Sequence, residues 1–132
     1  MKNDDERLID YLNHILEAVA RIERYIGDVD EVEFLQNELI QDAVIRNLEI
    51  IGEASHNIDT RYPTFAATHP DLPLSIAYQM QNAVAHGYFK VDYEIVWTTI
   101  RTDIFPLYTQ VQQLRDALVE AANRSGSRES QT

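Results

Sequence analysis

The segment "QNAVAHGYF", residues 81–89, carries the side chains most suited to chemistry. Asn82 and His86 are four residues apart and would share one helix face, where the alanines between them leave room for another backbone. Histidine titrates near neutral pH, so an imidazole beside a cleft can exchange protons with a bound ligand. Tyr88 would add a phenol at the same place. Spacing alone also fits the plainer reading, in which His86 is a packing or capping residue.

The composition limits the kind of protein that can carry this segment. The chain has 132 residues, no cysteine, and 22 acidic against 11 basic side chains, a formal net charge of −11. The length suits one domain, and the missing cysteines exclude disulfides, thiolate metal sites and cysteine nucleophiles. Because a negative field repels nucleic-acid phosphates, neither a DNA partner nor a general nucleic-acid coat function is expected.

The two ends of the chain give expectations for location and domain boundaries. The N-terminal segment is acidic where a signal peptide needs a basic flank, and no apolar run approaches membrane-spanning length. A cytoplasmic protein without a membrane partner is therefore expected. The polar end "NRSGSRESQT" predicts a folded domain over residues 1–122 and a disordered tail over 123–132.

Helical periodicity dominates the first half of the chain. Apolar residues from Leu8 to Ile26 step by four, three, four, three and four positions, which predicts a helix over residues 4–26 ending at Gly27. A second helix is expected over about residues 31–58. Its apolar stripe comprises Leu35, Leu39, Ala43, Leu48 and Ile51.

Helix signals also bracket the reactive segment. Pro73 suits the first position of a third helix, which Gly87 would end. Asp92 can cap a fourth helix that extends almost to the tail. The reactive histidine would thus lie at the end of the third helix, directly before Gly87.

Proline interrupts the pattern at two places. Residues 60–73 contain three prolines and predict a connection, with room for a short extra helix around Phe65. Pro106 lies inside the fourth helix and should kink it near residues 102–105. The chain is therefore expected to be an all-α antiparallel bundle with four main helices.

The run "IRNLEIIGEA", residues 45–54, allows two interpretations. In the structural one, Asn47 and Glu53 are solvated or capping groups on a central helix. In the functional one, both line the same cleft as His86. Polar groups occur on most helices, which favours the structural interpretation.

Three segments together resemble the HepT family of HEPN-domain proteins. They are "MQNAVAHGYFKVDYEIVW" at 80–97, "AVIRNLEIIGEAS" at 43–55 and the helix start at Pro73. The similarity covers roughly residues 4–118, and "NxxxHGYF" is its most specific part. It implies an all-α homodimer that cleaves RNA without metal in a cleft between subunits. It also implies a toxin whose antitoxin partner is a minimal nucleotidyltransferase.

The family motif is Arg, four residues, His, one residue, Tyr. By this resemblance His86 takes the acid/base role, and Asn82 matches the polar residue that follows the motif arginine. Tyr88 matches the tyrosine that orients substrate or accepts AMP from the antitoxin. A phosphate-bearing group beside His86 would block the cleft and repel RNA.

Gln81 stands where the motif has arginine. A neutral amide cannot offset the charge that builds on phosphorus, so the reaction should be slowed roughly 10²–10³-fold or lost. Natural divergence and a substitution introduced to reduce toxicity both explain Gln81. Arg46 and Arg101 could replace the missing charge, but the sequence assigns neither to the site.

Two function classes follow from these residues. The first is a HepT-like toxin of ribonuclease type, with His86, Gln81 and Asn82 as catalytic residues and Tyr88 as the modified one. The second is a non-catalytic HEPN subunit that binds a nucleotidyltransferase, which Gln81 and the negative charge favour. The remaining histidines form no ligand pair at metal spacing, so neither a metal nor a cofactor is expected; these are His14, His56 and His69.

Overall fold

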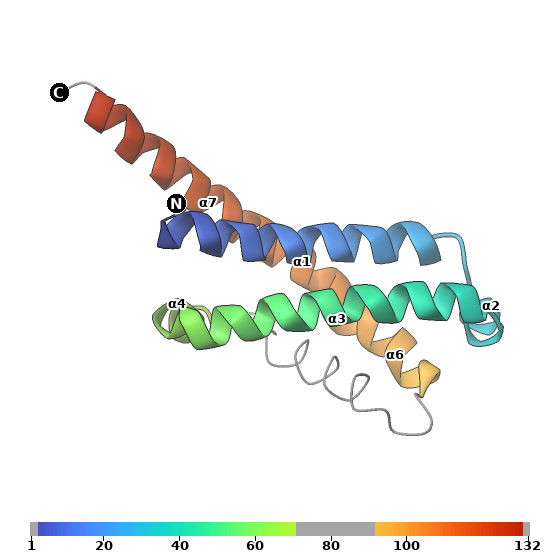
Figure 1. Cartoon of the computed structure of the whole chain (residues 1–132). Helices are drawn as coiled ribbons and strands as arrows, with labels where there is room; N and C mark the ends of the chain where they lie inside the picture. The colour runs from blue at the N-terminus through green and yellow to red at the C-terminus, as the bar shows by residue number, and fades with distance from the viewer. Residues whose placement is uncertain (1–2, 71–91, 131–132) are drawn as a thin grey trace.

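The computed structural model describes residues 3–70 and 92–130, with side chains described to residue 124. Two long helices, α1 (Asp4–Ile26) and α3 (Glu38–Arg61), lie side by side in opposite directions, and α7 (Phe105–Ser130) crosses α1 at an angle (Figure 1). No strand occurs in the described residues. The predicted all-α helical bundle is confirmed, whereas the helix predicted to start at Pro73 lies outside the described residues.

The first helix follows its sequence pattern. Asn3 caps α1 by accepting a hydrogen bond from the backbone N–H of Glu6 at 2.8 Å, and three acids follow in the first turn, where the helix dipole favours negative charge. Every apolar residue of the predicted stripe is buried. The stripe comprises Leu8, Leu12, Ile15, Val19, Ile22 and Ile26. The predicted bounds of this helix are therefore confirmed.

The predicted second helix is two helices. The chain breaks at Asn37 between α2 (Glu31–Gln36) and α3, and the Oδ1 of Asn37 accepts from the backbone N–H of Ile40 at 3.1 Å. This cap satisfies a free donor of α3 and lets the chain change direction. The single helix predicted over residues 31–58 was wrong at this point, and Leu39, placed in its stripe, is 80% exposed.

The predicted connection contains the short helix α4 (Pro63–Thr68), which starts with a proline, as helices often do. Tyr62, just before it, donates its phenol O–H to the backbone carbonyl of Asp4 at 2.9 Å. Burial raises the pKa of the Tyr62 phenol, and the Asp4 carboxylate raises it further. Tyr62 thereby holds the end of α3 against the start of α1.

The C-terminal region begins at a predicted cap. The Oδ1 of Asp92 accepts from the backbone N–H groups of Glu94 and Ile95, which starts α6 (Tyr93–Thr99). A π-helical turn, η1 (Ile100–Ile104), connects α6 to α7. In this turn the Phe105 N–H donates to the Ile100 carbonyl, five residues earlier, whereas an α-helix joins residues four apart. The predicted irregularity near residues 102–105 is thus a π-turn just before Pro106, which has no N–H to donate.

The end of α7 is helical through the segment for which the sequence predicts a disordered tail. Backbone helix continues to Ser130, and residues 121–124 are all exposed. That extension projects away from the bundle in Figure 1. The division into a domain over 1–122 and a tail over 123–132 stays a prediction.

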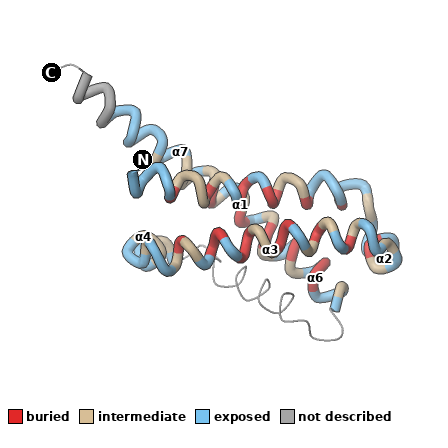
Figure 2. Tube along the Cα trace, viewed as in Figure 1, coloured by how far each residue is buried: buried red, intermediate tan, exposed pale blue. Residues whose placement is uncertain are grey.

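The core lies where the long helices face one another, as the buried positions in Figure 2 show. α1 packs most extensively against α3 and then against α7. Phe34 of α2, fully buried, contacts the rings of Tyr93 and Trp97 and so joins α2 to α6. Among the described helices none is long and apolar enough to cross a membrane.

Candidate functional site

Gln81, Asn82, His86 and Tyr88 lie outside the described residues, so their predicted roles stay predictions. The described helices on either side of them are separated in space. α4 packs against α3, and α6 packs against α2 near the opposite end of α3 (Figure 1). In the described part of the chain, α4 and α6 are thus the helices that flank the predicted site in the sequence.

Asn47, on α3, is buried, with 4% of its surface exposed. Its Nδ2 donates to the Ala43 carbonyl at 2.8 Å, and its Oδ1 accepts from the Nη1 of Arg21 on α1 at 3.4 Å. Both ends of the amide are thus used within the bundle. This geometry supports the structural interpretation of Asn47, while a shared cleft with His86 stays a prediction.

Glu53 is exposed and occupies a different place from Asn47. It lines a small cavity of about 200 Å³ between α1 and α3 with Tyr11, His14, Ile50, Ala54 and Asn57. Tyr11 and His14 meet there edge to face, with ring centroids 6.4 Å apart. The structure therefore brings Glu53 together with His14, a histidine for which no functional role was predicted.

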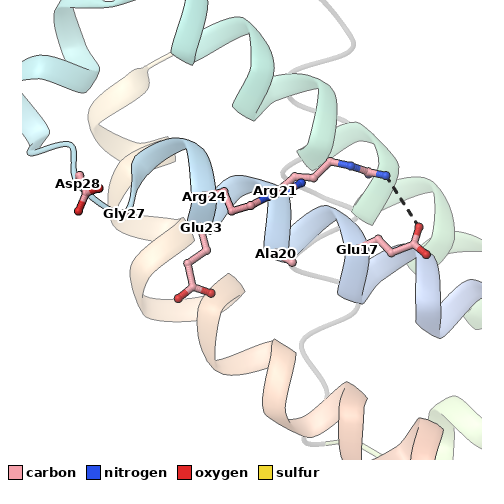
Figure 3. Close-up of a pocket in the computed structure, with 7 residues that line it drawn as sticks. All are labelled: Glu17, Ala20, Arg21, Glu23, Arg24, Gly27 and Asp28. Atoms are coloured by element: carbon pink, nitrogen blue, oxygen red, sulfur yellow. Dashed lines mark ion pairs between the residues drawn. The ribbon is translucent and has the colours of Figure 1, made fainter.

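A larger open groove, of about 760 Å³, runs along the second half of α1 (Figure 3). It is lined by Glu17, Ala20, Arg21, Glu23, Arg24, Gly27 and Asp28. Arg21 forms an ion pair with Glu17 at 3.9 Å in addition to its bond to Asn47. Because three carboxylates accompany two guanidinium groups, the groove is a poor cradle for phosphate.

An arginine on the π-turn has a different environment. The guanidinium carbon of Arg101 lies 4.9 Å from the ring centroid of Trp97, within the distance of a cation–π contact. Trp97 is buried and packs on Phe34 with ring centroids 5.2 Å apart, whereas Arg101 is exposed. Trp97 and Arg101 are four residues apart, a spacing that allows this contact on a helix.

The described residues contain no group of three or more side chains that could hold a metal ion. The histidines expected to play no part in catalysis are dispersed: His14 is on α1, His56 on α3, and His69 packs against Phe65 after α4. The described helices thus carry hydrogen-bonding, aromatic and cationic side chains.

Helical bundles of this kind support many activities, so the fold alone defines only the structural class. A family model described as HepT-like, ribonuclease HepT-like, matches residues 15–114. The chain belongs to this HepT-like ribonuclease family. The matched span includes α3, α6 and the whole segment predicted to be reactive.

Several relatives agree with the family match. "Probable ribonuclease HepT" of Thermococcus cleftensis is 40% identical over 106 residues, which cover 80% of this chain and 94% of the relative. A "Putative RNase" of Methanocaldococcus jannaschii is 34% identical over 102 residues, which cover 77% of this chain and 91% of the relative. "Gamma-glutamylcyclotransferase and putative RNase" of the same organism is 34% identical over 86% of this chain but only 50% of the relative. No solved structure matches the chain significantly.

Proposed function

We propose that this chain is a HepT-like toxin that cleaves RNA as a homodimer and is controlled by a minimal nucleotidyltransferase antitoxin. The observation that carries the proposal is the family match over residues 15–114, which contains His86 and Tyr88 at the motif spacing. Relatives named as ribonucleases support the same activity class. The cleft would form between two copies of the chain in the cytoplasm.

The chemistry needs no metal because RNA supplies its own nucleophile. The 2′-hydroxyl attacks the adjacent phosphorus as His86 removes its proton, and the bond to the 5′-oxygen breaks as that oxygen takes a proton from water. The products are a 2′,3′-cyclic phosphate and a free 5′-hydroxyl. Gln81 and Asn82 hold the phosphate by hydrogen bonds, and Tyr88 orients the substrate.

The direct test is RNA incubated with the purified chain in the presence of a chelator. The Gln81→Arg variant should cleave roughly 10²–10³-fold faster than the unchanged chain, because it restores a charged stabiliser. The double variant Gln81→Arg/His86→Ala should be inactive while its helical circular dichroism is unchanged. Intact RNA with both the unchanged chain and Gln81→Arg would overturn the proposal.

The modification of Tyr88 has its own test. Incubation with a minimal nucleotidyltransferase and ATP should add AMP to the chain, detected by intact mass, and should abolish cleavage by the Gln81→Arg variant. Tyr88→Phe should show neither change. AMP on a different residue would remove Tyr88 from its role but leave the nuclease proposal standing.

A second candidate function is a non-catalytic subunit that binds the nucleotidyltransferase. Gln81 and the net charge of −11 favour it, since both weaken RNA binding. Under this function His86→Ala leaves the cellular effect of the chain intact, and variants that break the partner complex abolish it. Loss of the effect in His86→Ala would favour the ribonuclease instead.

A further inference from the structure

Arg101 is held in place by an aromatic ring that is itself fixed. Trp97 is buried against Phe34, and the guanidinium carbon of Arg101 lies 4.9 Å from the Trp97 centroid. Such a contact orders the guanidinium and removes water from one of its faces. Within the described part of the chain no ion pair joins a carboxylate to Arg101.

The sequence around Arg101 contains few acidic residues, although the chain as a whole is acidic. Residues 95–102 contain no acidic side chain, and Arg101 is the only arginine in residues 62–114. The flanking acids are Glu94, about two helical turns earlier, and Asp103, two residues later. Side chains two residues apart do not face each other on a helix. The segment that carries Arg101 thus has few acidic residues for a chain with a formal net charge of −11.

Three other exposed arginines have more acidic surroundings. Arg7 directly follows three acids, and Arg24 shares its groove with Glu23 and Asp28. Arg46 is paired with Glu49 at 3.6 Å. Arg101 therefore has fewer acidic neighbours in the sequence than these three arginines.

The backbone at Arg101 is also unusual. It belongs to the π-turn Ile100–Ile104, and π-turns within helices occur frequently at functional sites. The turn lies on the element that follows the predicted reactive segment, since α6 starts at Tyr93, five residues after Tyr88. Arg101 thus combines a positive charge, an unusual backbone turn and a place in the sequence soon after the predicted reactive segment.

We infer that Arg101, stacked on Trp97, is a substrate-binding residue that contacts an RNA phosphate and supplies positive charge that Gln81 does not. This inference rests on the proposed ribonuclease function and adds to it a residue outside the family motif. Guanidinium binds phosphate through paired N–H donors, and RNA-binding proteins also use guanidinium planes for stacking. The contact affects substrate affinity, not proton transfer.

The test measures binding and cleavage separately. Fluorescence anisotropy with labelled single-stranded 2′-O-methyl RNA, which lacks the attacking hydroxyl, gives Kd at a series of salt concentrations. The variants are Arg101→Gln, Arg101→Lys and, as the matched control, Arg46→Gln. Cleavage of unmodified RNA is measured in parallel with each change in the Gln81→Arg background.

Arg101→Gln should raise Kd about 10-fold and lower the slope of log K against log salt by about 0.7, the value for one phosphate on a single strand. A purely structural role would not change that slope. Arg101→Lys should keep the slope and lose part of the affinity, because lysine lacks the planar donors. Arg46→Gln should change neither. In cleavage assays Arg101→Gln should mainly raise KM.

The opposing outcomes separate this inference from the proposed function. Equal salt slopes and Kd values for Arg101→Gln and Arg46→Gln, with Gln81→Arg still cleaving RNA, would overturn the role of Arg101 alone. Normal RNA binding by Arg101→Gln with loss of the nucleotidyltransferase complex would likewise overturn it, and would assign Arg101 to a protein interface. If no variant binds or cleaves RNA, the proposed function fails and the inference fails with it.

Discussion

The Nη1 of Arg21 on α1 donates to the Oδ1 of Asn47 on α3 across 3.4 Å, joining the two helices that form the largest part of the bundle. The same amide donates to the Ala43 carbonyl at 2.8 Å. A buried asparagine with both ends satisfied orders the contact between helices, because leaving either partner unpaired would cost free energy.

Replacing Asn47 should therefore lower stability. In Asn47→Ala, Arg21 loses its acceptor, and we expect the free energy of unfolding to fall by about 1–3 kcal/mol. Urea unfolding followed by circular dichroism measures the change. The control is Glu49→Gln, which removes only the exposed pair with Arg46 and should cost less than about 0.5 kcal/mol. Equal effects of the two variants would contradict the structural role of Asn47.

Tyr62 should make stability depend on alkaline pH. Burial, and then the Asp4 carboxylate, raise the pKa of the Tyr62 phenol above 10.0 in the folded state. The folded chain therefore holds this proton more tightly than the unfolded chain, so the stabilisation is complete below pH 10.0 and declines as pH rises through the folded-state pKa.

Tyr62→Phe should remove that decline together with the hydrogen bond to the Asp4 carbonyl. At neutral pH we expect the free energy of unfolding of Tyr62→Phe to be about 0.5–1.5 kcal/mol below that of the unchanged chain. This difference should become smaller as the pH rises above the usual tyrosine pKa. Thermal unfolding at several pH values measures both. Tyr25→Phe, which alters a partly exposed tyrosine on α1, is the control. A gap between the Tyr62→Phe variant and the unchanged chain that is constant with pH would contradict the argument.

The Asp92 cap should set the stability of α6. Asp92→Ala leaves the N–H groups of Glu94 and Ile95 without their side-chain acceptor, at a cost of about 0.5–2 kcal/mol. Asp92→Asn keeps a side-chain acceptor and should lose much less stability. Hydrogen exchange of the amides in α6 measures the effect locally, and unchanged protection in Asp92→Ala would show that the cap does not hold this helix.

The sequence predicted the parts of the fold that depend on local periodicity. α1 has one uninterrupted stripe and a capping residue, and its bounds were predicted correctly. The break at Asn37 was missed because Leu35 and Leu39, four apart, fit one continuous helix. The overlooked signal was Asn37 directly before an acidic first turn, a pattern typical of a new helix start.

Contacts between distant segments could not be predicted in this way. Arg21 and Asn47 are 26 residues apart, and their contact depends on how two helices align, which periodicity does not specify. The cavity that joins Glu53 to His14 arises from the same alignment. For Arg101 the sequence showed only a charge, since its pairing with a fixed Trp97 requires the packing of α2 on α6.

Phe34 provides that packing, and its replacement should affect both stability and RNA binding. It is fully buried and contacts Tyr93 and Trp97, with ring centroids 6.1 and 5.2 Å away. Phe34→Ala should lower the free energy of unfolding by about 3–5 kcal/mol because it opens a cavity, and Phe34→Leu should lower it clearly less. Val32→Ala, on the exposed side of the same helix, should cost less than about 0.5 kcal/mol.

The milder variant is the informative one for function, because it keeps the chain folded. Once Phe34→Leu loosens Trp97, Arg101 loses part of its fixed position, and the affinity for 2′-O-methyl RNA should fall while the salt slope stays the same. Val32→Ala should bind RNA as the unchanged chain does. If Phe34→Leu is less stable but binds RNA equally well, the ordering of Arg101 by Trp97 contributes nothing to binding, and only its charge does.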